Sequence, residues 1–223
     1  MRMGHLSQLT SFLLIIVGAT IASASGTTVG DGGHGVICPL PGRRAFIEPL
    51  DFYEARANWQ IIPSLANSLL PTGVGIEARI FEAERRFQEI GVAAPEVLER
   101  LEYAITLANN VRLTYLMPKT SDTGPFPKIA ANCRLAQLGV RVKFDAQEFI
   151  SFYGPYWNRM SEDAKAALLI HESLHLDFSG PDTRAIRQLI GYLAAPHDFR
   201  IRNRALIETI LRTRTAVDPS LFR

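Results

Sequence analysis

Apolar residues recur at helical spacing over two neighbouring stretches in the first half of the chain. From residue 76 to 90 they fall on one stripe, with charged residues around it, and Gly91 ends the pattern. Pro95 opens a second stretch, whose apolar positions face one way as far as Ala108. The pattern predicts a helical hairpin.

The other patterned stretches are shorter. Some show the helical spacing, and others show the two-residue alternation of a strand. Apolar and polar residues alternate over 138–144, which predicts a half-buried strand, and 112–117 is a candidate partner strand. Helical patterns cover 50–56, 183–193 and the basic C-terminal stretch. The Gly-rich segment 25–45 is typical of turns, with at most a short strand over 36–38. We therefore expect an α+β fold: a mainly helical single domain with a small antiparallel sheet.

The first 24 residues resemble a secretory signal peptide. Arg2 is followed by an apolar core over 12–21 and by the small residues Ala22, Ser23 and Ala24. An uncleaved N-terminal anchor is the alternative. No later stretch has the roughly 18 uncharged apolar residues of a spanning helix. We expect three parts: a signal peptide (1–24), a Gly-rich segment (25–45) and a mainly helical domain (46–223). The protein would be exported, to a periplasm or out of the cell.

Composition narrows the class of partner. The 223 residues carry 24 Lys and Arg against 22 Asp and Glu, so the net charge is +2, and it falls to +1 if Arg2 leaves with the signal peptide. Because positive and negative charges nearly balance, the chain has no general electrostatic attraction for nucleic acid, and we expect no nucleic-acid partner. In an oxidising compartment Cys38 and Cys133 are a candidate disulfide, with two free thiols as the alternative.

One motif in the sequence contains residues suited to metal binding and catalysis. Ser161, with acids after it, is a suitable N-cap for a helix that ends in His171, Glu172, Ser173, Leu174 and His175. Residues four apart lie on one helix face, so the two imidazoles can bind one metal ion at about 2.0–2.1 Å. Glu172 is rotated by about 100° from His171 and can reach a water molecule instead. The alternative is two helix-face histidines with a structural role.

This HExxH pattern resembles the zincin metallopeptidases. The resemblance implies one zinc ion bound by His171 and His175, with Glu172 as general base and a peptide or protein as substrate. It also implies a third, downstream ligand, for which Asp182, after a Gly-Pro pair, is the first candidate. Further candidates are His197, Asp198, Glu208 and His34. The longer metzincin and gluzincin patterns are absent.

A wider resemblance links residues 32–38, 50–55 and 166–172. Together they are similar to a group of uncharacterised exported bacterial proteins, in which the His-Glu pair is typical and the second histidine often is not. The sequence thus predicts an exported zinc-dependent metallohydrolase. The alternative is a non-catalytic exported or envelope-associated protein in which the HExxH helix is structural.

Overall fold

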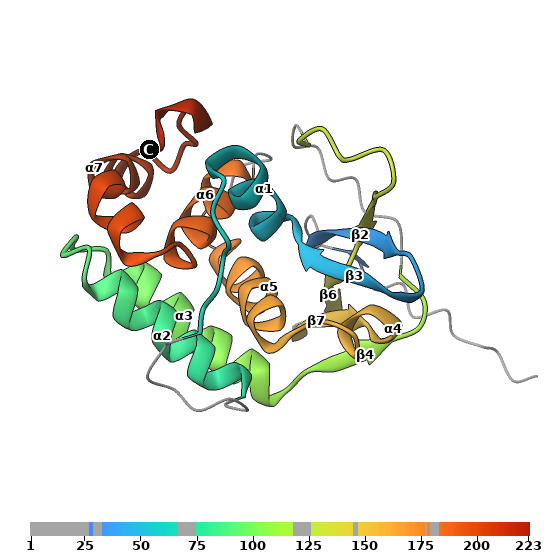
Figure 1. The fold of residues 1–223 in the computed structure, drawn as a ribbon. Coiled ribbons are helices and arrows are strands. Elements are labelled where there is room, and N and C mark those ends of the chain that lie inside the picture. The colour runs from blue at the N-terminus through green and yellow to red at the C-terminus, as the bar shows by residue number, and fades with distance from the viewer. Residues whose placement is uncertain are drawn as a thin grey trace, which may run out of the picture.

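The structure is a computed structural model that describes residues 27–28, 33–66, 75–117, 126–144, 147–176, 178 and 183–223. Helices gather on one side of the molecule and two small sheets on the other, with α5 (Glu162–Leu174) between them (Figure 1). The prediction of a mainly helical α+β domain is therefore confirmed. The predicted signal peptide lies outside the described residues.

The remaining helices are α1 (Leu50–Trp59), α2 (Ile76–Gln88), α3 (Pro95–Asn109), α4 (Gly154–Trp157), α6 (Arg184–Leu193), α7 (His197–Thr213) and a 3-10 turn, η1 (Pro219–Leu221). Most of them follow the sequence pattern, but α4 and the 3-10 turn η1 were not predicted. The hairpin of α2 and α3 is as predicted, with Pro95 in the first turn of α3. Gly91, between the two helices, has a φ of +68°, a conformation that glycine adopts at no steric cost.

Two sheets lie beside these helices. One has the order β3 (Arg43–Pro49), β2 (His34–Leu40), β5 (Arg134–Gln137), with antiparallel pairing throughout. The other has the order β1 (Thr27–Thr28), β6 (Gly139–Phe144), β7 (Gln147–Tyr153), β4 (Arg112–Thr114). In this second sheet β4 pairs in parallel with β7, and the other pairs are antiparallel.

Two sequence expectations need correction. The segment 112–117 forms a strand only over Arg112–Thr114, and it pairs with β7 rather than with β6. Only two residues separate β6 from β7, and so short a connection favours their mutual antiparallel pairing. The segment 25–45 also holds more strand than a short stretch over 36–38. It contains all of β2 and the start of β3, so the predicted boundary at 46 falls inside a strand.

The glycines of this segment permit close packing as well as turns. Gly42 turns the chain between β2 and β3 with a φ of +67°. At Gly35 a Cβ atom would lie 2.6 Å from the backbone oxygen of Glu48, so only glycine lets the backbones of β2 and β3 approach this closely. The abundance of glycine in the sequence does not indicate which glycines form turns and which permit close packing.

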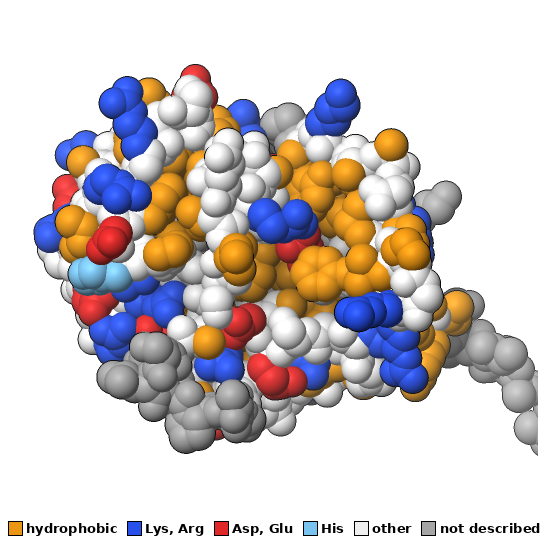
Figure 2. Space-filling view, in the orientation of Figure 1, with side chains coloured by type: hydrophobic (Ala, Val, Ile, Leu, Met, Phe, Trp, Pro, Cys, Tyr) orange, Lys and Arg blue, Asp and Glu red, His pale blue; other side chains and the backbone are white. Residues whose placement is uncertain are grey.

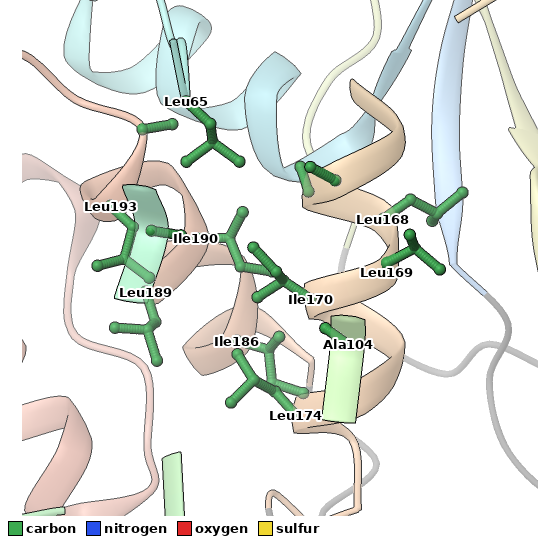
Figure 3. Packing of buried hydrophobic residues seen from close by; sticks show 14 of the residues in the cluster. Leu65, Ala104, Leu168, Leu169, Ile170, Leu174, Ile186, Leu189, Ile190 and Leu193 are labelled. Carbon is green, nitrogen blue, oxygen red and sulfur yellow. The ribbon is translucent and has the colours of Figure 1, made fainter. Parts of the chain in front are cut away.

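The core is centred on α5, which packs against α2, α3, α6 and β3. Ile170 and Leu174 point toward Ile186 and Ile190 of α6, whereas Leu168 points to the opposite side, toward the strands (Figure 3). Every residue of α5 from Ala166 to Leu174 is buried, so a polar side chain in this part of the helix must find its partners inside the protein.

The Cys38–Cys133 disulfide predicted as one of two alternatives is present, and it ties β2 to the residue before β5. The two cysteines are 95 residues apart, so in the chain-entropy model the bond contributes about 4.7 kcal/mol. No helix in the described ranges combines the length and apolarity of a membrane span.

Candidate active site

The HExxH motif occupies the C-terminal end of α5. Ser161 caps this helix by accepting a hydrogen bond from the backbone N of Ala164 at 3.2 Å, as its sequence position predicts. His171 and Glu172 lie inside the last turn, and His175 is the C-cap residue. The motif therefore lies at the end of α5 that approaches α1 and the two sheets.

His171 is held by a carboxylate from another element. Its Nδ1 atom lies 2.7 Å from Oδ1 of Asp51, which is in the first turn of α1. Both side chains are buried, at 5% and 1% exposure. Burial by itself lowers the pKa of His171, but the charge and hydrogen bond of Asp51 and the charge of Glu172 outweigh it and raise that pKa. With Nδ1 directed at Asp51, the nitrogen left to bind a ligand is Nε2.

His175 lies next to His171 on the same face of the helix. The two ring centroids are 5.0 Å apart, and the ring planes are inclined by 52°. Nε2 of His175 is buried. The pair thus has the proximity that the i, i+4 spacing predicts.

Glu172 points from α5 toward the sheets. Its Oε1 atom accepts a hydrogen bond from the backbone N of Gly33, and a Cβ atom at Gly33 would lie 2.6 Å from the same oxygen. The Gly33 carbonyl in turn accepts hydrogen bonds from the backbone N of Leu138 (2.8 Å) and of Gly139 (3.1 Å). Both sheets and the motif helix therefore meet at one glycine, which has no side chain to separate them.

The second carboxylate oxygen of Glu172, Oε2, is buried and has no hydrogen-bond partner among the described residues. Burial raises the pKa of Glu172, although the charges of His171 and Arg141 and the bond from Gly33 oppose the rise. A buried carboxyl group with a raised pKa and an oxygen without a partner is suited to exchange protons with a bound molecule.

A second buried ion pair joins α6 to α1, the helix that carries Asp51. Arg187, 1% exposed, donates from Nε to Oε2 of Glu54 at 2.8 Å and from Nη1 to the hydroxyl of Thr183. Burial raises the pKa of Glu54 against the opposing charge of Arg187. These contacts position α1 against α6, and with them Asp51.

The structure brings some of the predicted site residues together and separates others. His171, Glu172 and His175 are adjacent, whereas Asp182, the first candidate for a third ligand, lies outside the described residues. The other four candidates have different surroundings. His34 contacts the Phe126 ring, His197 and Asp198 begin α7, and Glu208 pairs with Arg204.

Within the described ranges, no group of three or more His, Cys, Asp or Glu side chains is arranged to hold a metal ion. The side chains present nevertheless supply part of a zinc site. His171 and His175 are neighbouring imidazoles, and buried Asp51 orients the first of them. Oε2 of Glu172 is a carboxyl oxygen without a hydrogen-bond partner among the described residues. A third protein ligand would have to come from outside these ranges.

Sequence reasoning missed Asp51, Gly33 and Glu54 as members of the site. A signal for them existed, because residues 32–38, 50–55 and 166–172 are the segments of the wider resemblance, and the structure joins all three. Gly33 contacts Glu172, and Asp51 contacts His171. Nothing in the spacing of Asp51 indicates which histidine it faces.

Compared with known proteins, the chain matches no protein-family model and has no significant match among curated proteins or solved structures.

Proposed function

We propose that the chain is an exported zinc-dependent metallohydrolase that cleaves peptide bonds. The observation that carries the proposal is the hydrogen bond between Asp51 and His171. Histidines that bind metals almost always give their other ring N–H to a carboxylate, a carbonyl or water, which fixes the tautomer and the ring orientation.

His171 and His175 would hold the metal, with Asp182 as the proposed third ligand. A bound zinc ion would supply Lewis acidity at a substrate carbonyl and lower the pKa of water toward about 7. The peptide as substrate rests on the resemblance of the motif alone.

Glu172 is the proposed general base and acid. Its raised pKa brings it closer to neutrality, where a carboxyl group can both accept and return a proton. Oε1 is oriented by the Gly33 N–H, so Oε2 is the atom that would take the proton from the attacking water and pass it to the leaving amine.

The export part of the proposal rests on two observations. A disulfide joins Cys38 and Cys133, and disulfides persist mainly in oxidising compartments. The N-terminal 24 residues have the pattern of a signal peptide.

The experiment that tests this function is hydrolysis of a set of unlabelled peptides, followed by mass spectrometry. The protein is purified from the periplasm of an exporting bacterial host, in wild-type form and as Glu172→Gln. We expect the Glu172→Gln variant to keep the bound zinc and to lose at least about a hundredfold in rate, the usual range for removal of a general base. Cleavage at the wild-type rate by Glu172→Gln would reject the assignment of the base.

A second function is favoured by the burial of the motif. His171 and Glu172 are 5% and 1% exposed, and neither lines any of four cavities found among the described residues. In this alternative the protein is a non-catalytic exported or envelope-associated module, and the Asp51–His171 and Gly33–Glu172 bonds join α5 to α1 and the sheets. It predicts folded protein without zinc and without hydrolysis.

A further inference from the structure

A separate hollow lies where α2 meets the start of α7. Its volume is about 470 Å³, and its lining contains the side chains of Arg85, Arg86, Arg200 and His197. None of the lining residues belongs to the candidate active site. Basic and acidic side chains and a histidine gather on this side of the molecule in Figure 2.

The charges that line this hollow do not cancel. Three guanidinium groups face the carboxylates of Glu82 and Glu89, which leaves one positive charge in excess before His197 is counted. Glu82 is shared between Arg85 and Arg86, and Glu89 between Arg85 and Arg200. Burial opposes ionisation of Glu82, but the bonds from Arg85 and Arg86 prevail and lower its pKa to about 2. Both carboxylates are thus already bound to arginines.

Arg200 is the lining residue with the most unused donors. It is 6% exposed, and it donates from Nη1 to the carbonyl of Ala195 at 2.7 Å and from Nη2 to Glu89 at 3.1 Å. A guanidinium group has five N–H donors, so further donors of Arg200 have no partner in the described ranges. Burial, together with the charge of Arg86, lowers the pKa of Arg200. A buried cation beside another cation is stabilised by any anion that enters.

The backbone adds to this positive field. Pro196 and His197 line the hollow, and α7 begins there and continues for 17 residues. The first turn of a helix presents N–H groups with no intrahelical partner, which favour anions. Asp198, the next residue, is exposed and does not line the hollow.

We propose that this hollow is a binding site for a phosphate group, in which Arg200, Arg85 and the start of α7 hold the anion. Two or three oxygens of one phosphate can accept hydrogen bonds from a guanidinium fork and from backbone N–H groups at once. The volume leaves room for a small organic group attached to the phosphate. The proposal does not depend on zinc at His171 and His175.

The test is isothermal titration of the purified full chain with inorganic phosphate and, separately, with glycerol 3-phosphate, at constant ionic strength. The protein is first treated with EDTA and dialysed, because phosphate also binds metal ions. Acetate and chloride are the control anions. The variant Arg85→Gln removes the excess charge at a side chain that is 49% exposed, so folding should be preserved.

Arg204→Gln is the matched control, since Arg204 is 48% exposed and pairs with Glu208 in the same i, i+4 arrangement outside the hollow. We expect saturable binding of one phosphate per chain, weakened at least about tenfold by Arg85→Gln and unchanged by Arg204→Gln. Tighter binding of glycerol 3-phosphate than of inorganic phosphate would identify an organic phosphate as the ligand. The proposal is overturned if wild-type protein shows no saturable phosphate binding, if acetate or chloride binds equally well, or if Arg204→Gln weakens binding as much as Arg85→Gln does.

Discussion

Replacing Asp51 by Asn tests whether its charge holds His171 in place. The amide keeps an oxygen that can accept the hydrogen bond from Nδ1 but lacks the negative charge. In the wild-type protein the 2.7 Å contact is buried and raises the pKa of His171. A hydrogen bond to a charged group contributes about 1.5–3 kcal/mol, and a neutral one about 0.5–1.5 kcal/mol. The difference between the two is about 1 kcal/mol, so we expect Asp51→Asn to lower the free energy of unfolding by about 1 kcal/mol at pH 5.5, where His171 is protonated.

The pH dependence of this loss has a definite sign. A histidine whose pKa is higher in the folded than in the unfolded state stabilises the protein fully below the unfolded value of about 6.5. That stabilisation disappears as the pH rises through the folded pKa. The cost of Asp51→Asn should therefore shrink between pH 5.5 and pH 9.5. The charge of Asp51 also contributes to the raised pKa of Glu172, so its removal makes ionised Glu172 less costly at high pH and shrinks the cost of Asp51→Asn further.

The assay is urea denaturation of metal-free, disulfide-intact protein, followed by circular dichroism at several pH values. A loss of about 1 kcal/mol lowers the urea concentration at the midpoint of unfolding by about 0.3–1 M, because the usual slope is about 1–3 kcal/mol per M. Asp163→Asn is the matched control, because Asp163 pairs with Arg79 at 2.8 Å and Arg79 stays charged throughout. Its cost should not vary with pH in this range. A cost of Asp51→Asn that is constant or grows with pH would refute the reasoning.

Three further predictions concern neighbouring features. Gly33→Ala should lower the free energy of unfolding by about 1–3 kcal/mol, because its Cβ would lie 2.2 Å from Leu168, whereas Gly75→Ala, with open space around it, should cost far less in the same denaturation assay. Glu172→Gln should raise the stability of the metal-free protein at pH 8, where the buried carboxylate is costly, and have less effect at pH 4; a loss of stability at pH 8 would contradict the raised pKa. Reduction of the Cys38–Cys133 bond should lower the unfolding free energy by about 2–5 kcal/mol, measured by calorimetry with and without reductant, and an unchanged Tm would show that the bond does not constrain the unfolded chain.

Local periodicity was enough to predict the longer helices, but it did not indicate the short helix α4 or the turn η1. The α2–α3 hairpin, α1, α5 and α6 follow from apolar spacing, from Pro95 and Gly91, and from the cap at Ser161. Strand pairing was harder, because pairing partners are set by tertiary packing. Nothing local in 112–114 indicates that its partner is β7 rather than β6.

In the candidate site, too, local neighbours were predicted from the sequence and long-range contacts were not. The i, i+4 spacing predicted that His171 and His175 would be neighbours, and their rings are. The contacts that orient the site come from residues 120 and 139 positions away, at Asp51 and Gly33, and sequence spacing carries no information about such distances. Gly-rich composition suggested turns at Gly33, whereas the missing side chain serves the approach of Glu172.

The most direct test of the central proposal is the zinc content of the purified protein. Wild-type protein, His175→Ala and the control Glu208→Gln are expressed with zinc, dialysed and measured by mass spectrometry of the metal. Glu208 pairs with Arg204 on the surface of α7, so its loss should not matter. The account predicts one zinc per chain in wild-type protein and in Glu208→Gln, and less than about a tenth of that in His175→Ala. Folded wild-type protein without zinc, or full zinc retention by His175→Ala, would contradict it.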